Sequence, residues 1–237
     1  FDNSVNGFLG PIDGFRQNAT IEISPAVGEA GISFQSFKLD MRKYQMINRD
    51  NSLAGRLYFG SSTGRNPSRF FLGGMQNWMA GSGTTDGIED GSRSRYGFLD
   101  SNNESLLQDL YLSELVWPMR GARYGERYGT NVLLMNFEYR FPLIKYLVTG
   151  PLVLGNILGH IFVDVGAAWD DPKEFTDISA LRNKYGDVSN SFSPWVRSIG
   201  YGIKLPIILP WRIEAAYDWT ESGFSKPQWY ISIGFDW

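Results

Sequence analysis

Side chains of opposite character alternate along most of the chain, with the period of two that a β-strand produces. The cleanest run lies near the middle, where Leu133, Met135 and Phe137 alternate with polar residues such as Glu138 and Arg140. Runs of the same kind recur at residues 16–24, 37–42, 53–59, 161–169, 198–205, 212–219 and 229–237. The pattern therefore predicts about eight antiparallel strands.

The two faces of these strands differ in composition. One face carries long aliphatic and aromatic side chains with almost no charge, and the other carries mixed charges in nearly every run. A soluble sandwich would set one face against a dry core and the other against bulk water. Lipid outside the sheet and a wet, charge-lined lumen inside it explain both faces together. The sequence thus predicts an all-β, transmembrane antiparallel β-barrel. Residues expected to face lipid are Leu133, Met135, Phe137, Ile231 and Phe235, and residues expected to face inward are Glu138, Arg140, Asp164 and Lys204.

The last nine residues form a strand that runs to the end of the chain. Trp229, Ile231, Ile233, Phe235 and Trp237 alternate there with more polar residues. An apolar outer face with an aromatic last residue is typical of the closing strand of an outer-membrane barrel. The run also resembles the C-terminal signal by which the barrel assembly machinery recognises such proteins. Taken alone, it is also compatible with an edge strand of a soluble sandwich.

Composition supports the membrane interpretation. The 237 residues include 8 Trp, 12 Tyr and 16 Phe, which suits the aromatic girdles of outer-membrane barrels. No stretch approaches the ~18 consecutive apolar residues of a membrane helix. The absence of Cys excludes a disulfide scaffold and a thiolate metal site, and the net charge of -3 argues against a nucleic-acid partner. The sequence opens on Phe1 with no signal peptide, which indicates a mature or partial chain.

A long loop insertion, residues 75–130, departs from the strand rhythm. It is rich in Gly, Ser and Asp at first, and residues 104–111 predict a short helix capped by Asn103 or Ser101. Loops of this length are usually functional or disordered. We expect this one to plug the lumen or lie outside the barrel, rather than to dock a partner. Shorter breaks at 206–210 and 221–227 are expected to be tight turns at one end of the barrel.

Five short motifs follow one another in a fixed order. They are Phe-Phe-Leu-Gly-Gly at 70–74, Met-Arg-Gly at 119–121, Phe-Glu-Tyr-Arg-Phe-Pro-Leu at 137–143, Phe-Val-Asp-Val-Gly at 162–166 and Gly-Tyr-Gly at 200–202. In this order they resemble the C-terminal half of BamA/TamA-type barrels, the bacterial surface antigen superfamily. The resemblance covers essentially the whole chain and implies about the last eight strands of a sixteen-strand barrel. Long insertions of this kind are expected in members that carry a periplasmic β-propeller before the barrel.

The resemblance also implies a contact inside the lumen. In the family, the Arg of the Arg-Gly motif folds back and meets the acidic residue of the Phe-x-Asp-x-Gly strand, positions that are Arg120 and Asp164 here. Glu138 is a second possible acceptor, and Gly121 allows a tight turn. An Arg–carboxylate fork is directional and stronger where water is excluded. A solvated position for Arg120 on the loop is the alternative.

The chain departs from the family pattern in two ways. Residues 75–118 intervene between the Gly-Gly pair and the Arg-Gly motif, which family members usually join directly. The aromatic residue that normally follows Arg-Gly is replaced by Ala122, with Tyr124 two positions on.

Other chemistry is weakly supported. His160, the one His, lies beside a predicted strand start and is expected to be an interfacial polar residue. The acidic run at 86–91 lacks the spacing of a calcium loop and is expected to be solvated, with calcium as the alternative. The Gly-x-Gly pair at 200–202 lies inside a strand, not at a strand-to-helix turn, so it does not predict a phosphate site. The sequence predicts no catalytic residue, cofactor or metal.

The expected function is the insertion or translocation of polypeptides at the bacterial outer membrane, by a protein that is not an enzyme. Expected partners are outer-membrane lipid, the barrel assembly machinery through the C-terminal strand, and a polypeptide substrate or periplasmic partner protein. Two alternatives stay open: a structural barrel that anchors a periplasmic domain or partner complex, and a barrel that secretes its own fused passenger.

Overall fold

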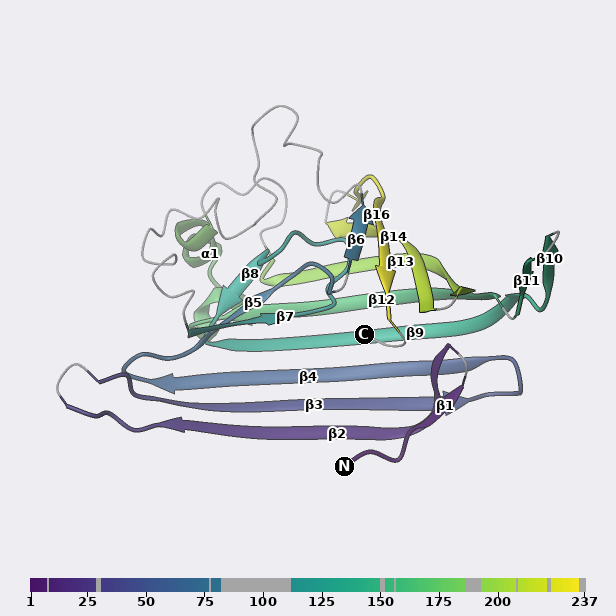
Figure 1. The fold of residues 1–237 in the computed structure, drawn as a ribbon. Helices are drawn as coiled ribbons and strands as arrows, with labels where there is room; N and C mark the ends of the chain where they lie inside the picture. Colours follow the sequence, from purple (N-terminus) through teal and green to yellow (C-terminus); the bar gives the residue numbers. More distant parts are fainter. Residues whose placement is uncertain are drawn as a thin grey trace.

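Eight strands of the described chain lie side by side in one curved antiparallel sheet, as the alternation predicts (Figure 1). The computed structural model describes residues 1–7, 9–28, 31–76, 78–81, 112–149, 152–155, 157–185, 193–207, 209–220 and 223–234. The wall strands are β2 (Gly10–Ser24), β3 (Phe34–Met46), β4 (Ser52–Gly64), β9 (Asn131–Ile144), β12 (Ile157–Trp169), β13 (Trp195–Ile207), β14 (Leu209–Thr220) and β16 (Gln228–Ile233). The predicted all-β fold is confirmed.

Shorter elements surround this wall. They are β1 (Val5–Gly7), β5 (Arg69–Leu72), β6 (Trp78–Gly81), β7 (Ser113–Val116), β8 (Arg127–Gly129), β10 (Leu147–Thr149), β11 (Leu152–Leu154), a 3-10 helix (Pro172–Phe175), α1 (Ile178–Tyr185) and β15 (Gly223–Phe224). The main sheet has the order β1-β2-β3-β4-β9-β12-β13-β14-β16-β6, so it is open in this chain, with β1 and β6 at its edges. No helix among the described residues is long and apolar enough to cross a membrane.

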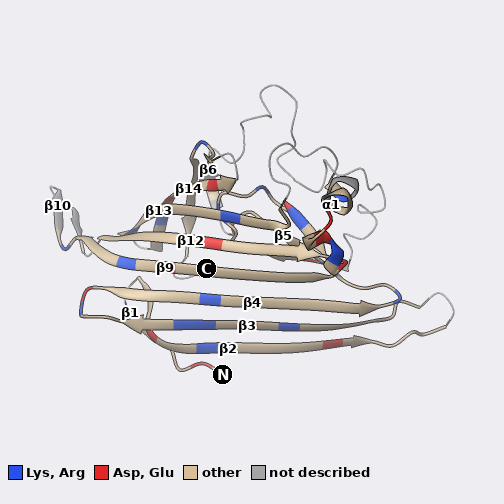
Figure 2. Ribbon diagram, turned by 180° about the vertical axis from the view of Figure 1, so that it is seen from behind, with Lys and Arg blue, Asp and Glu red and all other residues tan. Residues whose placement is uncertain are grey.

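The outer face of the wall carries the exposed apolar side chains. Phe137 on β9 is 51% exposed and Met135 is 38% exposed, whereas their neighbours Asn136 and Glu138 are buried. The same alternation continues on β12 and β13, where Ile161 and Ile199 point outward. Figure 2 shows that charged residues occupy only scattered positions along the wall strands. This largely apolar outer face, which also carries the charged residues Lys43 and Arg197, is the surface expected to contact lipid.

The strand registers order the lumen face into rows that run across the sheet. Asp164 on β12 lies between Asn136 on β9 and Ser198 on β13. A second row contains Arg140, His160, Gly202, Glu214 and Tyr230, on β9, β12, β13, β14 and β16. Residues far apart in the sequence therefore share one patch of the inner wall.

The lumen is not charge-lined throughout, which corrects the expectation of a wet, polar interior. Near the end where β4 stops and β9 begins, a small sheet of order β7-β5-β8 lies on the inner face of the wall. Side chains of this sheet and of the loop between β7 and β8 form an apolar plug, composed of Phe70, Leu72, Val116, Met119 and Ala122. The plug packs on wall residues Tyr58, Val132, Leu134, Ala168 and Val196. Alternation alone cannot show whether water or a folded loop faces a strand.

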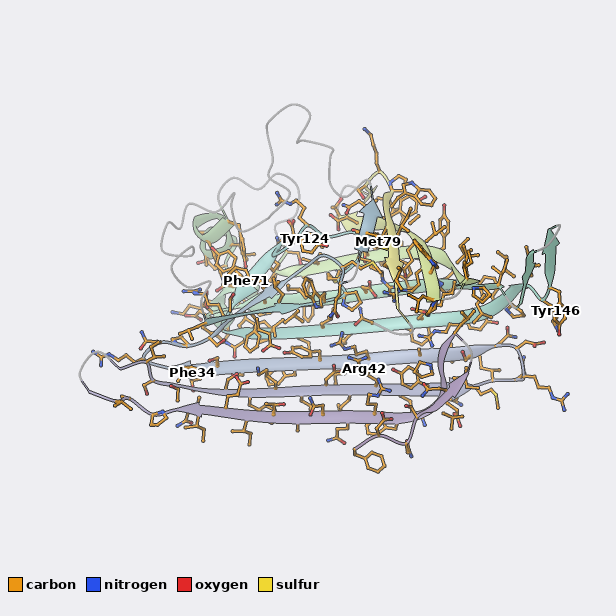
Figure 3. The ribbon with its side chains drawn as sticks, in the orientation of Figure 1. Phe34, Arg42, Phe71, Met79, Tyr124 and Tyr146 are labelled. Atoms are coloured by element: carbon orange, nitrogen blue, oxygen red, sulfur yellow. The ribbon has the colours of Figure 1, made fainter. Side chains whose placement is uncertain are left out.

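A short helical cap follows β12 at this loop end of the barrel. Asp171 caps the 3-10 helix in a reciprocal capping box with Glu174, which fixes where the helix begins. The next helix, α1, packs Leu181 and Tyr185 against Phe71, labelled in Figure 3, and against Tyr128 on β8. The cap therefore covers the side of the small lumenal sheet that carries Phe71 and Tyr128.

The two short breaks lie at opposite ends of the barrel, not at the same end as predicted. The turn near Pro206 joins β13 to β14, and the break after Thr220 joins β14 to β16, so consecutive antiparallel connections must alternate ends. The β10–β11 hairpin connects β9 to β12 at the same end as the β13–β14 turn, with Tyr146 beside it (Figure 3). The helix predicted at 104–111, the acidic run at 86–91, and Phe235 and Trp237 lie outside the described residues.

Replacing Phe137 with Lys tests the lipid-facing surface. In such barrels a Lys costs about 2–4 kcal/mol at the bilayer midplane and about 0–1 kcal/mol near the interface. We expect F137K to lower the free energy of unfolding in liposomes by about 2–4 kcal/mol, measured by urea titration of heat-modifiable gel migration. Y146K, beyond the end of β9, is the control and should cost less than about 1 kcal/mol. Equal costs for both variants would contradict the lipid-facing assignment.

Acid should loosen the helical cap through Asp170. Burial raises the pKa of this carboxyl, but the ammonium of Lys184, with its Nζ 2.9 Å from Oδ2, and the backbone N–H of Thr130 outweigh burial and leave the pKa below 3.8. Because the folded-state pKa is lowered, the stabilisation is complete above pH 3.8 and is lost as the pH falls through the folded-state pKa. We expect amide hydrogen exchange in α1 to accelerate below pH 3.8, relative to D170N measured at the same pH, which lacks this dependence. D50N, on the polar turn at the other end, is the control.

Candidate functional site

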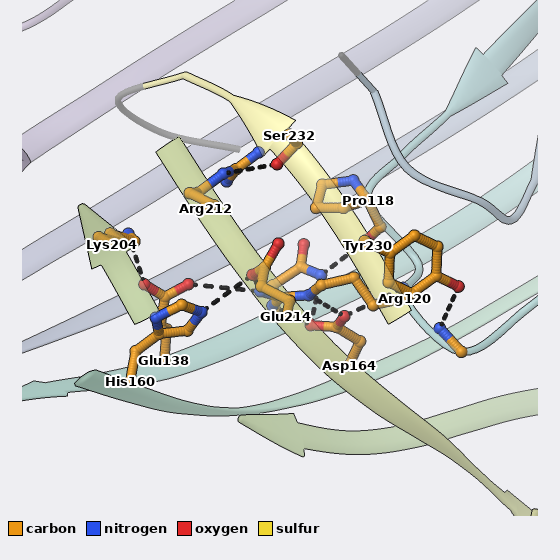
Figure 4. A network of polar contacts seen from close by, with 12 residues as sticks. Pro118, Arg120, Glu138, His160, Asp164, Lys204, Arg212, Glu214, Tyr230 and Ser232 are labelled. Carbon is orange, nitrogen blue, oxygen red and sulfur yellow. Dashed lines mark hydrogen bonds and ion pairs between the residues drawn. The ribbon is translucent and has the colours of Figure 1, made fainter. Parts of the chain in front are cut away.

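Arg120 is fully buried in the lumen and makes a two-pronged contact with Asp164 (Figure 4). Its Nε lies 2.8 Å from Oδ2 of the carboxylate, and its Nη2 lies 2.8 Å from Oδ1. The backbone N–H of Arg120 also donates to Oδ2, at 3.2 Å. This bidentate, charge-assisted geometry is directional, because the planar guanidinium matches the carboxylate fork.

The strand that carries Asp164 also supplies a surface beneath the guanidinium. Cζ of Arg120 lies 3.4 Å from the centroid of the Phe162 ring, two residues before Asp164 on β12. Asn136, opposite Asp164 on β9, donates from Nδ2 both to Oδ1 of Asp164, at 2.8 Å, and to the carbonyl of Pro118, at 2.9 Å. The wall thus holds the Arg side chain and the backbone two residues before it.

Two more carboxylates reach the same guanidinium. Nη1 of Arg120 lies 2.8 Å from Oε1 of Glu214 on β14 and 3.5 Å from Oε2 of Glu138 on β9. Glu138 is itself bound by Arg140 at 2.6 Å and by Lys204 at 2.8 Å. We call Arg120, Glu138, Arg140, Asp164, Lys204 and Glu214 the ion network; each of these residues is at most 3% exposed. Each of its three cations faces at least one of its three carboxylates, as a buried site requires.

His160 contacts this network through Glu214 and is buried inside the lumen, not at the membrane interface, which corrects the prediction. It is 1% exposed, and its Nε2 lies 2.9 Å from Oε1 of Glu214. Strand β12 begins at Ile157, so His160 lies inside the strand and shares the inward face with Phe162 and Asp164. Gly202 lies between the pair in its row, and a Cβ there would come within 2.7 Å of both side chains.

The terminal strand contacts the Arg-Gly loop, which we define as residues 117–126 between β7 and β8. The N–H of Gly121 donates to the hydroxyl of Tyr230, at 3.1 Å, and its carbonyl accepts from Nε2 of Gln228, at 2.8 Å. Gly121 has a φ of 82°, and its Cα faces the wall so closely that a Cβ would lie 3.1 Å from Cβ of Ser198. A left-handed backbone against a wall is a position for Gly.

The residues on either side of the insertion lie next to each other. The N–H of Met119 donates to the carbonyl of Gly74 at 2.9 Å, so the Gly-Gly and Arg-Gly motifs are adjacent although residues 75–118 separate them. A Cβ at Gly73 would collide with the carbonyl of Arg123. The ring of Tyr124 lies against Gly74, and Ala122 is buried in the apolar plug. The Gly-Gly and Arg-Gly motifs therefore stay in contact despite the insertion.

On β16, the residues proposed for recognition occupy the outer face as far as the structure describes them. Trp229 is 43% exposed, and Ile231 and Ile233 are half-buried on the same side. Tyr230 and Ser232 are buried on the lumen side, where Arg212 donates to the hydroxyl of Ser232 at 3.2 Å. The role of the outer face as an assembly signal stays a prediction.

Among the residues that the structure describes, no group of three or more His, Cys, Asp or Glu side chains is placed to hold a metal ion. The carboxylates of the ion network face Arg and Lys instead.

A curved antiparallel sheet with a largely apolar outer face and buried ion pairs inside is typical of an outer-membrane β-barrel. The chain belongs to the Omp85 superfamily, whose domain model matches residues 2–237. It is therefore a protein of the bacterial outer membrane, as the resemblance implied. Among solved structures it is similar to BamA from Haemophilus ducreyi lacking POTRA domains 1–3, with a TM-score of 0.51 and 12% identity. The match covers 99% of this chain and 41% of that one, so the chain spans less than half of the BamA structure. No curated protein sequence matches the chain.

Sequence reasoning named Arg120, Gly121, Asp164 and Glu138, and the structure brings all four together. It gave no role to Glu214, Gln228 or Tyr230, although Glu214 and Tyr230 lie in the predicted runs 212–219 and 229–237. A signal existed for Glu214 and Tyr230, because their inward parity was readable. Their place beside Arg120 required the strand register.

Replacing Arg120 with Ala should strongly destabilise the barrel. Removing one partner of a buried ion pair typically lowers the free energy of unfolding by about 3–5 kcal/mol, because the remaining carboxylates lose the positive charge that compensates them. We expect R120A to lower the free energy of unfolding by about that amount in urea titrations of heat-modifiable migration. R120K should restore only part of it, since an ammonium cannot form the planar fork. R49A, on an exposed turn, is the control, and an R120K variant as stable as the native chain would contradict the fork.

Proposed function

We propose that this chain is the membrane-embedded part of a protein that inserts polypeptides into the bacterial outer membrane or translocates them across it. The observation that carries the proposal is the ion network around Arg120, which seats a loop motif on the inner wall of an Omp85 barrel. A barrel that served only as an anchor would be equally stable with an apolar interior, because buried ion pairs add little net stability. A network that fixes one loop position is better suited to a part that moves.

The seat of this loop supports the proposal further. Its contacts reach β9, β12, β14 and β16, so the loop position depends on the mutual arrangement of the last wall strands. The apolar plug and the small sheet β7-β5-β8 fill the same end of the lumen. A polypeptide that uses the lumen or the terminal strands must therefore displace, or act through, this loop.

The test is reconstitution of the full-length protein in liposomes with a chemically unfolded outer-membrane barrel as client. Insertion predicts faster client folding than in empty liposomes, and translocation predicts protease protection of an unfolded polypeptide. R120A should lose the effect, whereas R49A should retain it. If the native protein neither speeds client folding nor protects a polypeptide, the proposal is wrong and an anchoring or self-secreting barrel takes its place.

Charges at the last aromatic residues should block assembly of the protein itself. We expect the double variant F235D/W237D to be depleted from outer membranes in cells, because the closing strand must be recognised as well as buried. A carboxylate on the lipid face costs a folded barrel less than the about 2–4 kcal/mol of a Lys at the bilayer midplane, so purified variant refolded in detergent should stay heat-modifiable. Normal membrane levels of the double variant would contradict the proposed signal. W219D, on the outer face of β14 but outside the terminal run, is the matched control.

A further inference from the structure

The terminal strand holds the Arg-Gly loop through hydrogen bonds that are separate from the ion network. Both backbone groups of Gly121 are bound by side chains of β16, the N–H by the Tyr230 hydroxyl and the carbonyl by the Gln228 amide. The Tyr230 hydroxyl in turn donates to Oε1 of Gln228, at 2.7 Å. The two side chains therefore form one closed set of hydrogen bonds around a single peptide position, immediately after Arg120.

Packing connects the same strand to the guanidinium itself. The buried ring of Tyr230 belongs to a cluster with Met75, Phe162 and Ala216. Phe162 is the ring beneath the Arg120 guanidinium, at 3.4 Å. A shift of Tyr230 away from the wall would thus remove a hydrogen bond from Gly121 and a neighbour from the ring that supports Arg120.

The insertion adds a third connection to β16. Its strand β6 pairs with the edge of β16 that faces away from β14, with Gly81 opposite Tyr230 and Ala80 opposite Ile231. The segment that leads to β6 begins at Met75, which lies in the cluster with Tyr230. The start of the insertion and the Arg-Gly loop that ends it are consequently attached to the same short strand.

We propose that Tyr230 and Gln228 are positioning residues that couple the Arg-Gly loop to the terminal strand, so that movement of β16 away from the wall releases Gly121 and weakens the seat of Arg120. Neither side chain takes part in the ion network; both act through the loop backbone. The consequence for insertion rests on the proposed function, whereas the coupling itself does not.

These 237 residues contain no Cys, so one introduced Cys can report on the coupling once any Cys elsewhere in the full-length protein is replaced. Ala122, next to Gly121, is 5% exposed, so A122C should react slowly with a hydrophilic maleimide while the loop is seated. Full-length A122C in liposomes is compared with the same protein carrying Y230F, Q228A, R120A or, as the matched control, Y201F. Tyr201 lies on the outer face of β13, 47% exposed, and Y201F removes a hydroxyl that does not face the loop.

We expect Y230F and Q228A each to raise the labelling rate about tenfold, because each removes a hydrogen bond that closes the loop. R120A should raise it at least as much, and Y201F should leave it unchanged. Heat-modifiable migration, which reports the intact barrel, should be the same in Y230F, Q228A and Y201F, which separates release of the loop from general destabilisation. Because Y230F and Q228A are measured separately, the other variant still tests the coupling if one of them fails to fold.

Labelling of Y230F and Q228A at the native rate, with fast labelling of R120A, would overturn the inference, because the ion network alone would then hold the loop. Slow labelling in all variants would overturn it as well, since the apolar plug would be sufficient. The client-folding assay on the same proteins separates the two proposals. Fast labelling with unimpaired client folding would support the coupling and count against a role for the loop in insertion.

Discussion

The buried guanidinium of Arg120 is the constraint on which the arrangement of the lumen depends. A charge with no exposed surface must be compensated where it lies, and the compensation here comes from Asp164, Glu214 and Glu138 on three separate strands. Glu138 in turn binds Lys204 and Arg140, so the contacts of one loop residue extend over a large part of the inner wall. The register of the strands then determines which side chains can serve, and this explains why the network follows rows across the sheet.

Much of the wall could be predicted from the sequence, because a period of two assigns each side chain to one of two faces. Phe137 and Glu138 lie on the predicted sides, and so do Ile161 and Asp164. What alternation cannot provide is the relation between strands. The pairing of Arg120 with Asp164 came from a resemblance, since no local pattern joins residues 44 positions apart. His160 was misplaced for a simpler reason: its strand begins at Ile157, four residues before the predicted run at 161–169, so a position expected at the end of the strand is inside the lumen.

The insertion was the least predictable part, and the structure explains why the chain tolerates it. Gly74 and Met119 are joined by a backbone hydrogen bond, so the intervening residues leave and re-enter at one point of the lumen. The entropic cost of closing a loop grows only slowly with its length. An insertion whose two ends lie side by side can therefore be long without disturbing the contact between Gly74 and Met119. Tyr124 against Gly74 and Ala122 in the apolar plug complete this junction, with the aromatic ring displaced by two positions from the family pattern.

Ion pairs in a dry lumen add little net stability, yet removing one partner is expensive, and this asymmetry has a mechanical consequence. An apolar loop could slide along the wall in small steps, each exposing a little surface. The Arg120 fork has few favourable intermediate positions, because partial withdrawal breaks the bidentate contact with Asp164 and weakens the contacts with Glu214 and Glu138 at the same time. Under the proposed coupling, the hydrogen bonds from Tyr230 and Gln228 favour the seated loop only while the terminal strand stays on the wall. A loop held in this way by the last described wall strand is what a barrel would need if opening at its edge and clearing its lumen were to occur together.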